Sequence, residues 1–286
     1  KEALACLGYG IKNKKGFILL TGEVGTGKTT LLNRILEWLK LQRIATAFMF
    51  NPRLSVTQFF DFMMTDFGIT CESMEKSRVL VRLNQWLLDR YRRGEGAVLI
   101  IDEAQNLSNE LLEEIRLLTN LETSTEKLLQ IILSGQPELE HKLKQPELRQ
   151  LKQRITLRCR TYPLTLEETG EYMTQRLRLA GSNGTAVFTP EAVEAIYKFA
   201  QGVPRVTNLL CEHSLISAFV DQKKPVEATT VEEVAREFEL DDLPRGMTPG
   251  MGGENLSMME AVKIISGLQR NRKAEEKTAV PKETER

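Results

Sequence analysis

The sequence predicts an α/β protein in which a mostly parallel sheet is followed by a small all-helical domain. Short apolar runs alternate with helical spacing up to about residue 160, which predicts strands joined by crossover helices. The run Ala97-Val-Leu-Ile-Ile101 lacks polar alternation, as expected for a strand covered on both faces. From Thr165 onward only helical spacing is found.

The strands and helices of the first part follow from apolar runs and the breaks between them. Five apolar runs predict strands at residues 16–20, 45–50, 97–101, 128–133 and 155–160. Apolar residues at helical spacing predict helices at residues 29–41, 55–67, 77–92 and 109–119. Asn51-Pro52 ends the second strand, because proline cannot donate to a sheet. Strands and helices that alternate in this way imply right-handed crossovers.

The second part is predicted to be helical and to end in a tail. Helical spacing continues at residues 166–180, 190–200, 204–220 and 230–238. Beyond Leu240 the chain is rich in glycine and proline and then charged, which is typical of a flexible linker and a mostly disordered tail. A short helix is predicted within it at 257–268. We expect a first domain at 1–162, a helical domain at 163–240 and the tail at 241–286.

The composition is that of an ordinary globular protein. Hydrophobic residues make up 41% and charged residues 27%, which excludes a fibrous or disordered class. The 39 basic residues balance the 39 acidic ones, so there is no bulk attraction to nucleic acid or to an anionic membrane. A local basic patch could still bind either.

The cysteines and the lengths of the apolar runs indicate in which cellular compartment the protein is expected. Cys6, Cys71, Cys159 and Cys211 stand far apart, so we expect reduced thiols in place of a metal site or a disulfide. No apolar run reaches the roughly 20 residues that span a bilayer, and no signal peptide opens the sequence. We expect a cytoplasmic protein that partners could hold at the inner face of the membrane. Because Lys1 lies inside a helical pattern, the natural N-terminus is expected further upstream.

A glycine-rich segment between the first strand and the first helix carries a phosphate-binding pattern. It fits GxxxxGK[ST] with Gly22, Glu23, Val24, Gly25, Thr26, Gly27, Lys28 and Thr29, followed by Thr30. Glycines let backbone N–H groups turn toward phosphates, and the helix N-terminus adds its positive end. Lys28 can neutralise the outer phosphates, and the Thr29 hydroxyl can bind Mg²⁺. The alternative, a turn without a ligand, is disfavoured by the strand-loop-helix context.

Two adjacent carboxylates follow the buried strand at 97–101. Asp102 can hold Mg²⁺, and Glu103 can polarise the attacking water. Alone, such an Asp-Glu pair is typical of a strand followed by a helix cap. Together with the phosphate loop about 75 residues upstream, it favours hydrolysis of a nucleotide. ATP with Mg²⁺ is expected, because the sequence has no Asn-Lys-x-Asp motif for guanine.

Five segments in order resemble a known family. They are residues 22–30, Ile100-Ile-Asp-Glu-Ala-Gln105, Leu133-Ser-Gly-Gln-Pro-Glu-Leu139, Leu148-Arg-Gln-Leu-Lys-Gln-Arg-Ile155 and Gly202-Val-Pro-Arg-Val-Thr-Asn208. Over residues 2–240 the chain resembles the AAA+ ATPases of the general secretion pathway protein A (ExeA-type) family. The resemblance implies an AAA+ P-loop NTPase fold, with a parallel five-stranded sheet in the order 5-1-4-3-2 and a small all-helical lid domain.

The resemblance also implies roles for residues outside these two motifs. Gln136 resembles the sensor that hydrogen-bonds the terminal phosphate or the attacking water, with Ser134 as second candidate. The alternative is an ordinary turn amide before Pro137. Arg154 and Arg149 resemble arginine fingers that reach into a neighbouring subunit, where a guanidinium stabilises charge on the transferred phosphoryl group. Their alternative is a solvated basic stretch.

Two further residues complete the implied site. Arg205, at the start of a helix of the second domain, resembles the sensor arginine that carries the state of the bound nucleotide to the lid. Pro204 and Gly202 fix the entry to this helix. Asn51 could hydrogen-bond Glu103 and hold it inactive until a partner binds, or it is simply a turn residue before proline.

Three functions are open to such a protein. The favoured one is a cytoplasmic ATPase that oligomerises with ATP between subunits, in a ring or another assembly, and drives assembly or export of an envelope machine such as a type II secretion or pilus system. The second is a regulator that assembles on duplex DNA and directs a transposase or a helicase, which the basic run from Arg149 to Arg160 keeps open. The third is a slow nucleotide switch or scaffold that acts through its tail.

Overall fold

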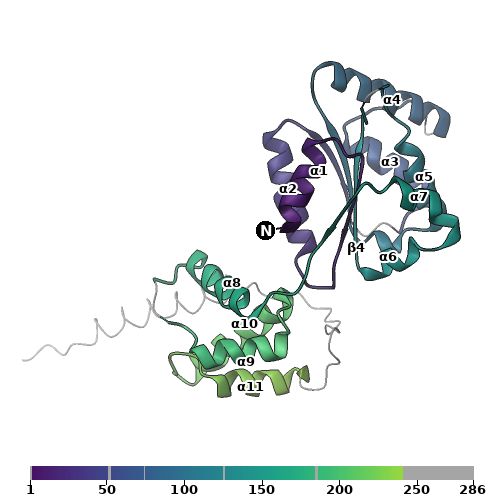
Figure 1. Cartoon of the computed structure of the whole chain (residues 1–286). Helices are drawn as coiled ribbons and strands as arrows, with labels where there is room; N and C mark the ends of the chain where they lie inside the picture. The colour runs from purple at the N-terminus through teal and green to yellow at the C-terminus, as the bar shows by residue number, and fades with distance from the viewer. Residues whose placement is uncertain (1, 51–52, 74, 125, 184–185, 241–286) are drawn as a thin grey trace, which may run out of the picture. The chain divides into compact units, whose positions relative to one another are not determined.

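Two compact units make up the chain, Lys1–Tyr162 and Pro163–Arg286. The computed structural model describes residues 2–50, 53–73, 75–124, 126–183 and 186–240 (Figure 1). The predictions for Asn51 and for the tail, including the helix at 257–268, lie outside the described residues.

The first unit is built on a parallel sheet of five strands. They are β1 (Phe17–Thr21), β2 (Ala45–Met49), β3 (Ala97–Ile101), β4 (Gln130–Gly135) and β5 (Leu157–Arg160). Their order is β2-β3-β4-β1-β5, and each neighbouring pair is parallel. This confirms the predicted order 5-1-4-3-2, read from the other edge. β1, β3 and β4 are buried along their whole length, because helices cover both faces.

Helices connect the strands and cover the sheet. They are α1 (Glu2–Lys12), α2 (Lys28–Leu41), α3 (Val56–Asp66), α4 (Lys76–Arg92), α5 (Asn109–Leu118), α6 (Pro137–Lys142) and α7 (Arg149–Arg154), with the 3-10 turns η1 (Ala104–Asn106) and η2 (Pro146–Leu148). α1 and α2 lie on one face, and α3, α4, α5 and α7 on the other (Figure 1). The elements α6, α7, η1 and η2 escape prediction, because six residues or fewer give no periodic signal.

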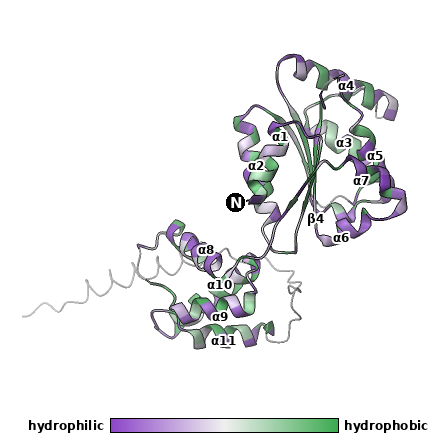
Figure 2. Ribbon diagram, viewed as in Figure 1, coloured by the Kyte–Doolittle hydropathy of each residue, from purple (hydrophilic) through white to green (hydrophobic). Residues whose placement is uncertain are grey.

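Alternate strand residues pack into two separate hydrophobic cores. Along β1, Phe17 and Leu19 enter the core under α3, α4 and α5. Ile18 and Leu20 enter the core under α1 and α2. Figure 2 shows the resulting pattern, with apolar strands between helices of mixed hydropathy.

Predicted boundaries differ from the structure by one or two residues in most elements, and three cases have a clear local reason or size. α2 begins one residue earlier, because Gly27 takes a left-handed conformation (φ 91°) and ends the loop there. β4 lies two residues later than predicted, from Gln130 to Gly135. β5 begins at Leu157, since Ile155 still closes α7.

The second unit has four helices among its described residues. They are α8 (Leu166–Leu179), α9 (Pro190–Ala200), α10 (Pro204–Val220) and α11 (Ala228–Glu237). They enclose a core of their own, which includes Ile196, Leu210 and Val231. Thr165 and Glu168 cap α8, each side chain accepting the backbone N–H of the other. No described helix is both long and apolar enough to cross a bilayer.

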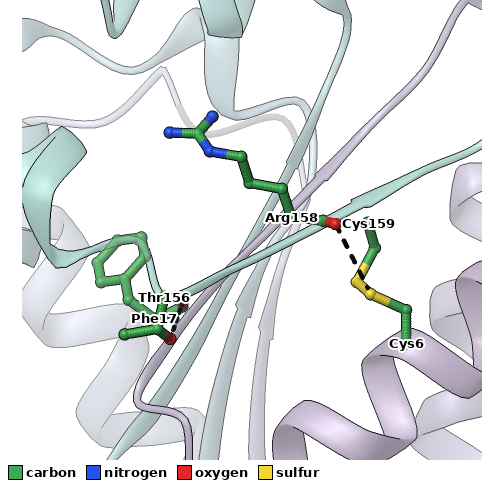
Figure 3. Close-up of a disulfide and its surroundings, with 5 residues drawn as sticks. All are labelled: Cys6, Phe17, Thr156, Arg158 and Cys159. Atoms are coloured by element: carbon green, nitrogen blue, oxygen red, sulfur yellow. Dashed lines mark hydrogen bonds between the residues drawn. A yellow bond between two sulfur atoms is a disulfide. The ribbon is translucent and has the colours of Figure 1, made fainter.

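A disulfide joins α1 to the edge strand β5. Cys6 and Cys159 are bonded, with Cα atoms 5.9 Å apart and a sequence separation of 153 (Figure 3). The expectation of reduced thiols is therefore wrong for this pair, while Cys71 and Cys211 are free. Sequence spacing could not reveal the pair, because only the packing of α1 against β5 brings the two cysteines together. The Cys6 sulfur also lies 3.8 Å from the carbonyl oxygen of Arg158.

Candidate active site

The phosphate-loop residues connect the end of β1 to the start of α2. Gly25 and Gly27 have φ angles of 79° and 91°, which residues with side chains rarely adopt. Gly22 is needed for another reason, because a Cβ there would lie 1.9 Å from the Thr161 hydroxyl oxygen and 2.8 Å from its carbonyl oxygen. The hydroxyls of Thr26 and Thr161 are hydrogen-bonded at 2.8 Å. The loop thus packs against the end of β5.

Lys28 is turned toward the loop itself. It is 5% exposed, and its ammonium donates to the carbonyl oxygens of Gly22 (2.8 Å) and Glu23 (3.0 Å). Burial lowers the pKa of this amine from its usual 10.5, although the carboxylates of Glu103 and Asp102 act in the opposite direction. From this position the ammonium can neutralise an anionic phosphate. The exposed loop positions are Glu23, Thr29 and Thr30, and Val24 is half-buried.

Asp102 links three elements at the end of β3. Its side chain is nearly buried, and its two carboxylate oxygens accept the hydroxyls of Thr29 on α2 (2.7 Å) and Ser134 on β4 (2.7 Å). Its backbone N–H donates to the Met49 carbonyl of β2 (2.8 Å). Asp102 therefore ties the start of α2 to the ends of three neighbouring strands.

Thr29 and Asp102 offer the hard oxygen ligands that Mg²⁺ prefers. Their oxygens lie 2.7 Å apart, so a single ion could contact both. Among the described residues there is no group of three or more His, Cys, Asp or Glu side chains placed to hold a metal. An ion here would take its other ligands from phosphates and water, as Mg²⁺ commonly does.

Glu103 is held by two glutamines. It takes a left-handed conformation (φ 52°, ψ 37°) that leads β3 into η1. Its Oε2 accepts hydrogen bonds from the side-chain amides of Gln105 (2.5 Å) and Gln136 (3.1 Å). The Oε1 of Gln105 in turn accepts the backbone N–H of Gln136 (3.2 Å). Sequence reasoning assigns no role to Gln105, because a glutamine in a turn has no distinctive pattern.

A second polar cluster supports the same edge of the sheet. Glu140 of α6 accepts the hydroxyl of Thr21 (2.6 Å) and pairs with Arg160 (2.8 Å). Desolvation raises the pKa of Glu140, but the hydrogen bonds from Thr21 and Arg160 outweigh it, and the pKa is lowered overall. The ends of β1 and β5 are thereby joined to α6.

Arg154 and Arg149 are not brought to the phosphate loop of their own chain. Arg154 ends α7, is exposed, and has its Nη2 atom 3.3 Å from the Asn120 side-chain oxygen. Two residues later, Thr156 donates to the carbonyl of Phe17 at the amino end of β1 (Figure 3). Arg154 therefore lies near the amino-terminal ends of the strands, whereas the phosphate loop follows the carboxyl-terminal end of β1. Arg149 begins α7 and is also exposed.

The other two implied residues belong to other parts of the chain. Arg205 is an exposed residue in the first turn of α10, in the second unit. Asn51 lies outside the described residues. The side chains that the structure does bring together are Lys28, Thr29, Asp102, Glu103, Ser134 and Gln136, with Gln105 added.

Comparison with known proteins agrees with this arrangement. The family described as AAA domain matches residues 11–143, which include the phosphate loop, β3 and β4. The chain therefore contains an AAA domain. Over 219 residues the AAA chain is 42% identical to general secretion pathway protein A of Aeromonas hydrophila. That match covers 76% of this chain and 40% of the relative, so the chain spans about two fifths of the relative's length.

Solved structures share the fold of this AAA-domain chain at low sequence identity. Cdc6p from Pyrobaculum aerophilum has a TM-score of 0.62 and 18% identity, over 84% of this chain and 68% of that one. The ORC2 protein of Aeropyrum pernix has a TM-score of 0.58 and 16% identity, over 85% and 69%. The Holliday junction branch migration motor RuvB of Thermotoga maritima has a TM-score of 0.55 and 18% identity, over 82% and 66%. Identities this low show the fold alone.

Proposed function

We propose that this chain binds ATP with Mg²⁺ and hydrolyses it to ADP and phosphate. The junction at Asp102 carries this proposal, because one nearly buried carboxylate contacts both the Thr29 hydroxyl and the Ser134 hydroxyl. This carboxylate lies beside the phosphate loop, where it can hold Mg²⁺, and the second carboxylate, Glu103, is next in the chain. An ordinary connection from a strand to a helix needs none of these groups.

Binding rests on the loop in this proposal. The backbone N–H groups at the start of α2 hold the phosphates, and Lys28 exchanges its carbonyl partners for phosphate oxygens. Thr29 and Asp102 hold Mg²⁺, which when bound neutralises charge on the transferred phosphoryl group.

Turnover rests on Glu103 and its partners. Glu103 orients the attacking water and accepts its proton. Gln136 contacts the terminal phosphate or the water, and Arg205 carries the state of the nucleotide into the helical unit.

The position of Arg154 supports the proposal of an oligomer. A guanidinium at the amino-terminal ends of the strands cannot contact a phosphate bound to the loop of its own chain. It can instead stabilise charge at the site of a neighbouring subunit. Arg149 is the second candidate. A mixture of Arg154→Ala and Glu103→Gln chains should hydrolyse ATP faster than either chain alone, since each provides what the other lacks. A mixture no faster than the sum of its parts would contradict a finger acting between subunits.

The driven process is proposed from the sequence relative. The 42% identity to general secretion pathway protein A favours assembly or export of a bacterial secretion or pilus machine. Its partners would be envelope components, with the ATPase in the cytoplasm, where ATP is supplied.

Duplex DNA is the alternative partner, and the Holliday junction motor shares this fold. The structure weakens this alternative, because the basic run is interrupted. Arg160 is paired with Glu140, and Arg154 lies beside Asn120. The run therefore does not present one continuous row of unpaired cations.

Comparison of the wild type with Glu103→Gln tests the activity. The wild type should release phosphate from ATP only with Mg²⁺. The variant should bind ATP with unchanged affinity and turn it over about 10²- to 10⁴-fold more slowly. If the wild type binds ATP but releases no phosphate, hydrolysis is contradicted, and the switch or scaffold function is favoured.

The ATP-loaded Glu103→Gln protein also separates the two partner classes. Its binding to duplex DNA is measured across a salt series that includes about 150 mM. Tight, salt-sensitive and ATP-dependent binding would favour the DNA regulator. Absence of binding by protein shown to hold ATP would favour an envelope partner.

A further inference from the structure

Both the nitrogen and the oxygen of the Gln105 side-chain amide form hydrogen bonds. Its nitrogen donates to Glu103 Oε2 at 2.5 Å, and its oxygen accepts the backbone N–H of Gln136 at 3.2 Å. Because one end of an amide only donates and the other only accepts, these two contacts fix its orientation. The side chain therefore spans from the end of β3 to the end of β4.

Two further contacts hold this glutamine in place. At Gly135, the last residue of β4, a Cβ would lie 2.7 Å from the Gln105 side-chain oxygen, so the absence of a side chain makes room for the bridge. Lys142 of α6 donates to the backbone carbonyls of Gln105 (3.3 Å) and Leu107. The turn that carries Gln105 is therefore attached to α6, and its side chain to β4.

We infer that Gln105 is a positioning residue that aims Glu103 at the attacking water. This inference rests on the proposed hydrolysis. Both amide donors bind Oε2 of Glu103, and no hydrogen bond within the described part of the chain uses Oε1. Oε1 is thus the oxygen that can accept the proton of water, and its direction is set by the contacts to Oε2.

We expect Gln105 and Gln136 to have different roles, with Gln105 orienting Glu103 and Gln136 contacting the terminal phosphate. The Gln136 side chain donates to Glu103 (3.1 Å), and it can exchange that bond for one to a terminal phosphate while its backbone N–H stays bound to Gln105. When it turns, Gln105 remains as the donor to Glu103. Loss of Gln105 should therefore lower the rate of the chemical step, whereas loss of the Gln136 side chain should also weaken the preference for ATP over ADP.

The test compares Gln105→Leu with the wild type. The ATP dissociation constant, the single-turnover rate with Mg²⁺ and the melting temperature are measured for each. The rate should fall about 10- to 100-fold, while the dissociation constant changes less than about twofold. Gln145→Leu is the matched control, because Gln145 is an exposed glutamine that bonds Asn109 and does not touch Glu103.

A double variant separates positioning from a structural role. In a Glu103→Gln background, Gln105→Leu should cause no further loss of rate, because it acts through Glu103. Equal losses in both backgrounds, or a normal rate for Gln105→Leu in an active wild type, would overturn the inference and leave the proposed function standing. Absence of turnover in the wild type would overturn both.

Gly135→Ala provides an independent route to the same bridge. Its Cβ would lie 2.7 Å from the Gln105 oxygen and 2.8 Å from the Leu139 side chain, so the melting temperature is measured beside the rate. The rate should fall as in Gln105→Leu, with ATP affinity retained. An unchanged rate in this variant would also contradict the inference.

Discussion

The phosphate loop and the ends of β3 and β4 share one edge of the sheet but are held in different ways. The loop is held by backbone, through positive φ angles at Gly25 and Gly27 and carbonyl oxygens around Lys28. The strand ends are held by side chains, with Asp102 and Glu103 each bonded to hydroxyls or amides from other elements. Backbone groups suit any phosphate chain, whereas the carboxylates suit a metal and a water.

Because of this difference, we expect the loop to determine the affinity for nucleotide and the strand ends to determine the rate of hydrolysis. Variants of the loop should lose affinity for ATP and ADP alike, because both carry the phosphates that the loop contacts. Variants at the strand ends should keep affinity and lose turnover.

Lys28→Ala should have the largest effect. Charge-assisted hydrogen bonds contribute about 1.5–3 kcal/mol each, so losing two to phosphate should weaken binding of ATP and ADP by about 100-fold or more. Isothermal titration calorimetry measures this. Unchanged affinity would mean that phosphates are not held by this loop.

Asp102→Asn should stop turnover but spare binding. Without the carboxylate, Mg²⁺ loses its charged protein ligand, so the rate should fall by about 100-fold or more. ATP affinity measured in EDTA should stay within about threefold of the wild type. Normal Mg²⁺-dependent hydrolysis by this variant would contradict the proposal that the strand ends determine the rate of turnover.

Rising pH should weaken binding through Lys28. Burial holds the pKa of the free amine below 10.5, and phosphate charge favours the protonated form in the complex. Affinity is therefore greatest while the amine is protonated and falls as pH rises through the lowered pKa, which lies below 10.5. ADP titrations from about pH 7 to about pH 10 measure this. Lys28→Arg keeps its charge, so an equal decline in that variant would assign the effect to other groups.

Cys6→Ser should have the smallest effect on turnover. Closure of a loop of this length stabilises the oxidised protein by about 5 kcal/mol in the chain-entropy model. The oxidised wild type should therefore melt above Cys6→Ser, and the reduced wild type should melt near it, while ATPase rates agree within about twofold. Cys71→Ser is the control, since Cys71 is free. A changed rate would show that α1 and β5 influence the loop.

The loop and the carboxylate pair could be predicted from sequence because both are local patterns. The residues from Gly22 to Thr29 are contiguous, and Asp102 with Glu103 follows one buried apolar run. The order of the strands was also predictable, through the resemblance carried by five segments. These features need no knowledge of which residues meet across the sheet.

Contacts across the sheet could not be predicted. Gln105 meets Gln136 because β3 and β4 are parallel neighbours, with Ile101 opposite Leu133. One sequence alone does not record such a register. The Cys6 pairing was missed for the same reason, since it depends on where the edge strand lies.

Gly22 and Thr161 constrain each other in a way that a library of variants would reveal. Any side chain at position 22 collides with Thr161, so replacements there should be depleted even when selection is for folding alone. A second change of Thr161 to glycine would remove the hydroxyl contact at 1.9 Å but not the carbonyl oxygen at 2.8 Å, so it should rescue Gly22→Ala only in part. Transplanting this loop into another sheet would accordingly require the glycine at position 22 wherever a residue of threonine's size follows the adjacent strand.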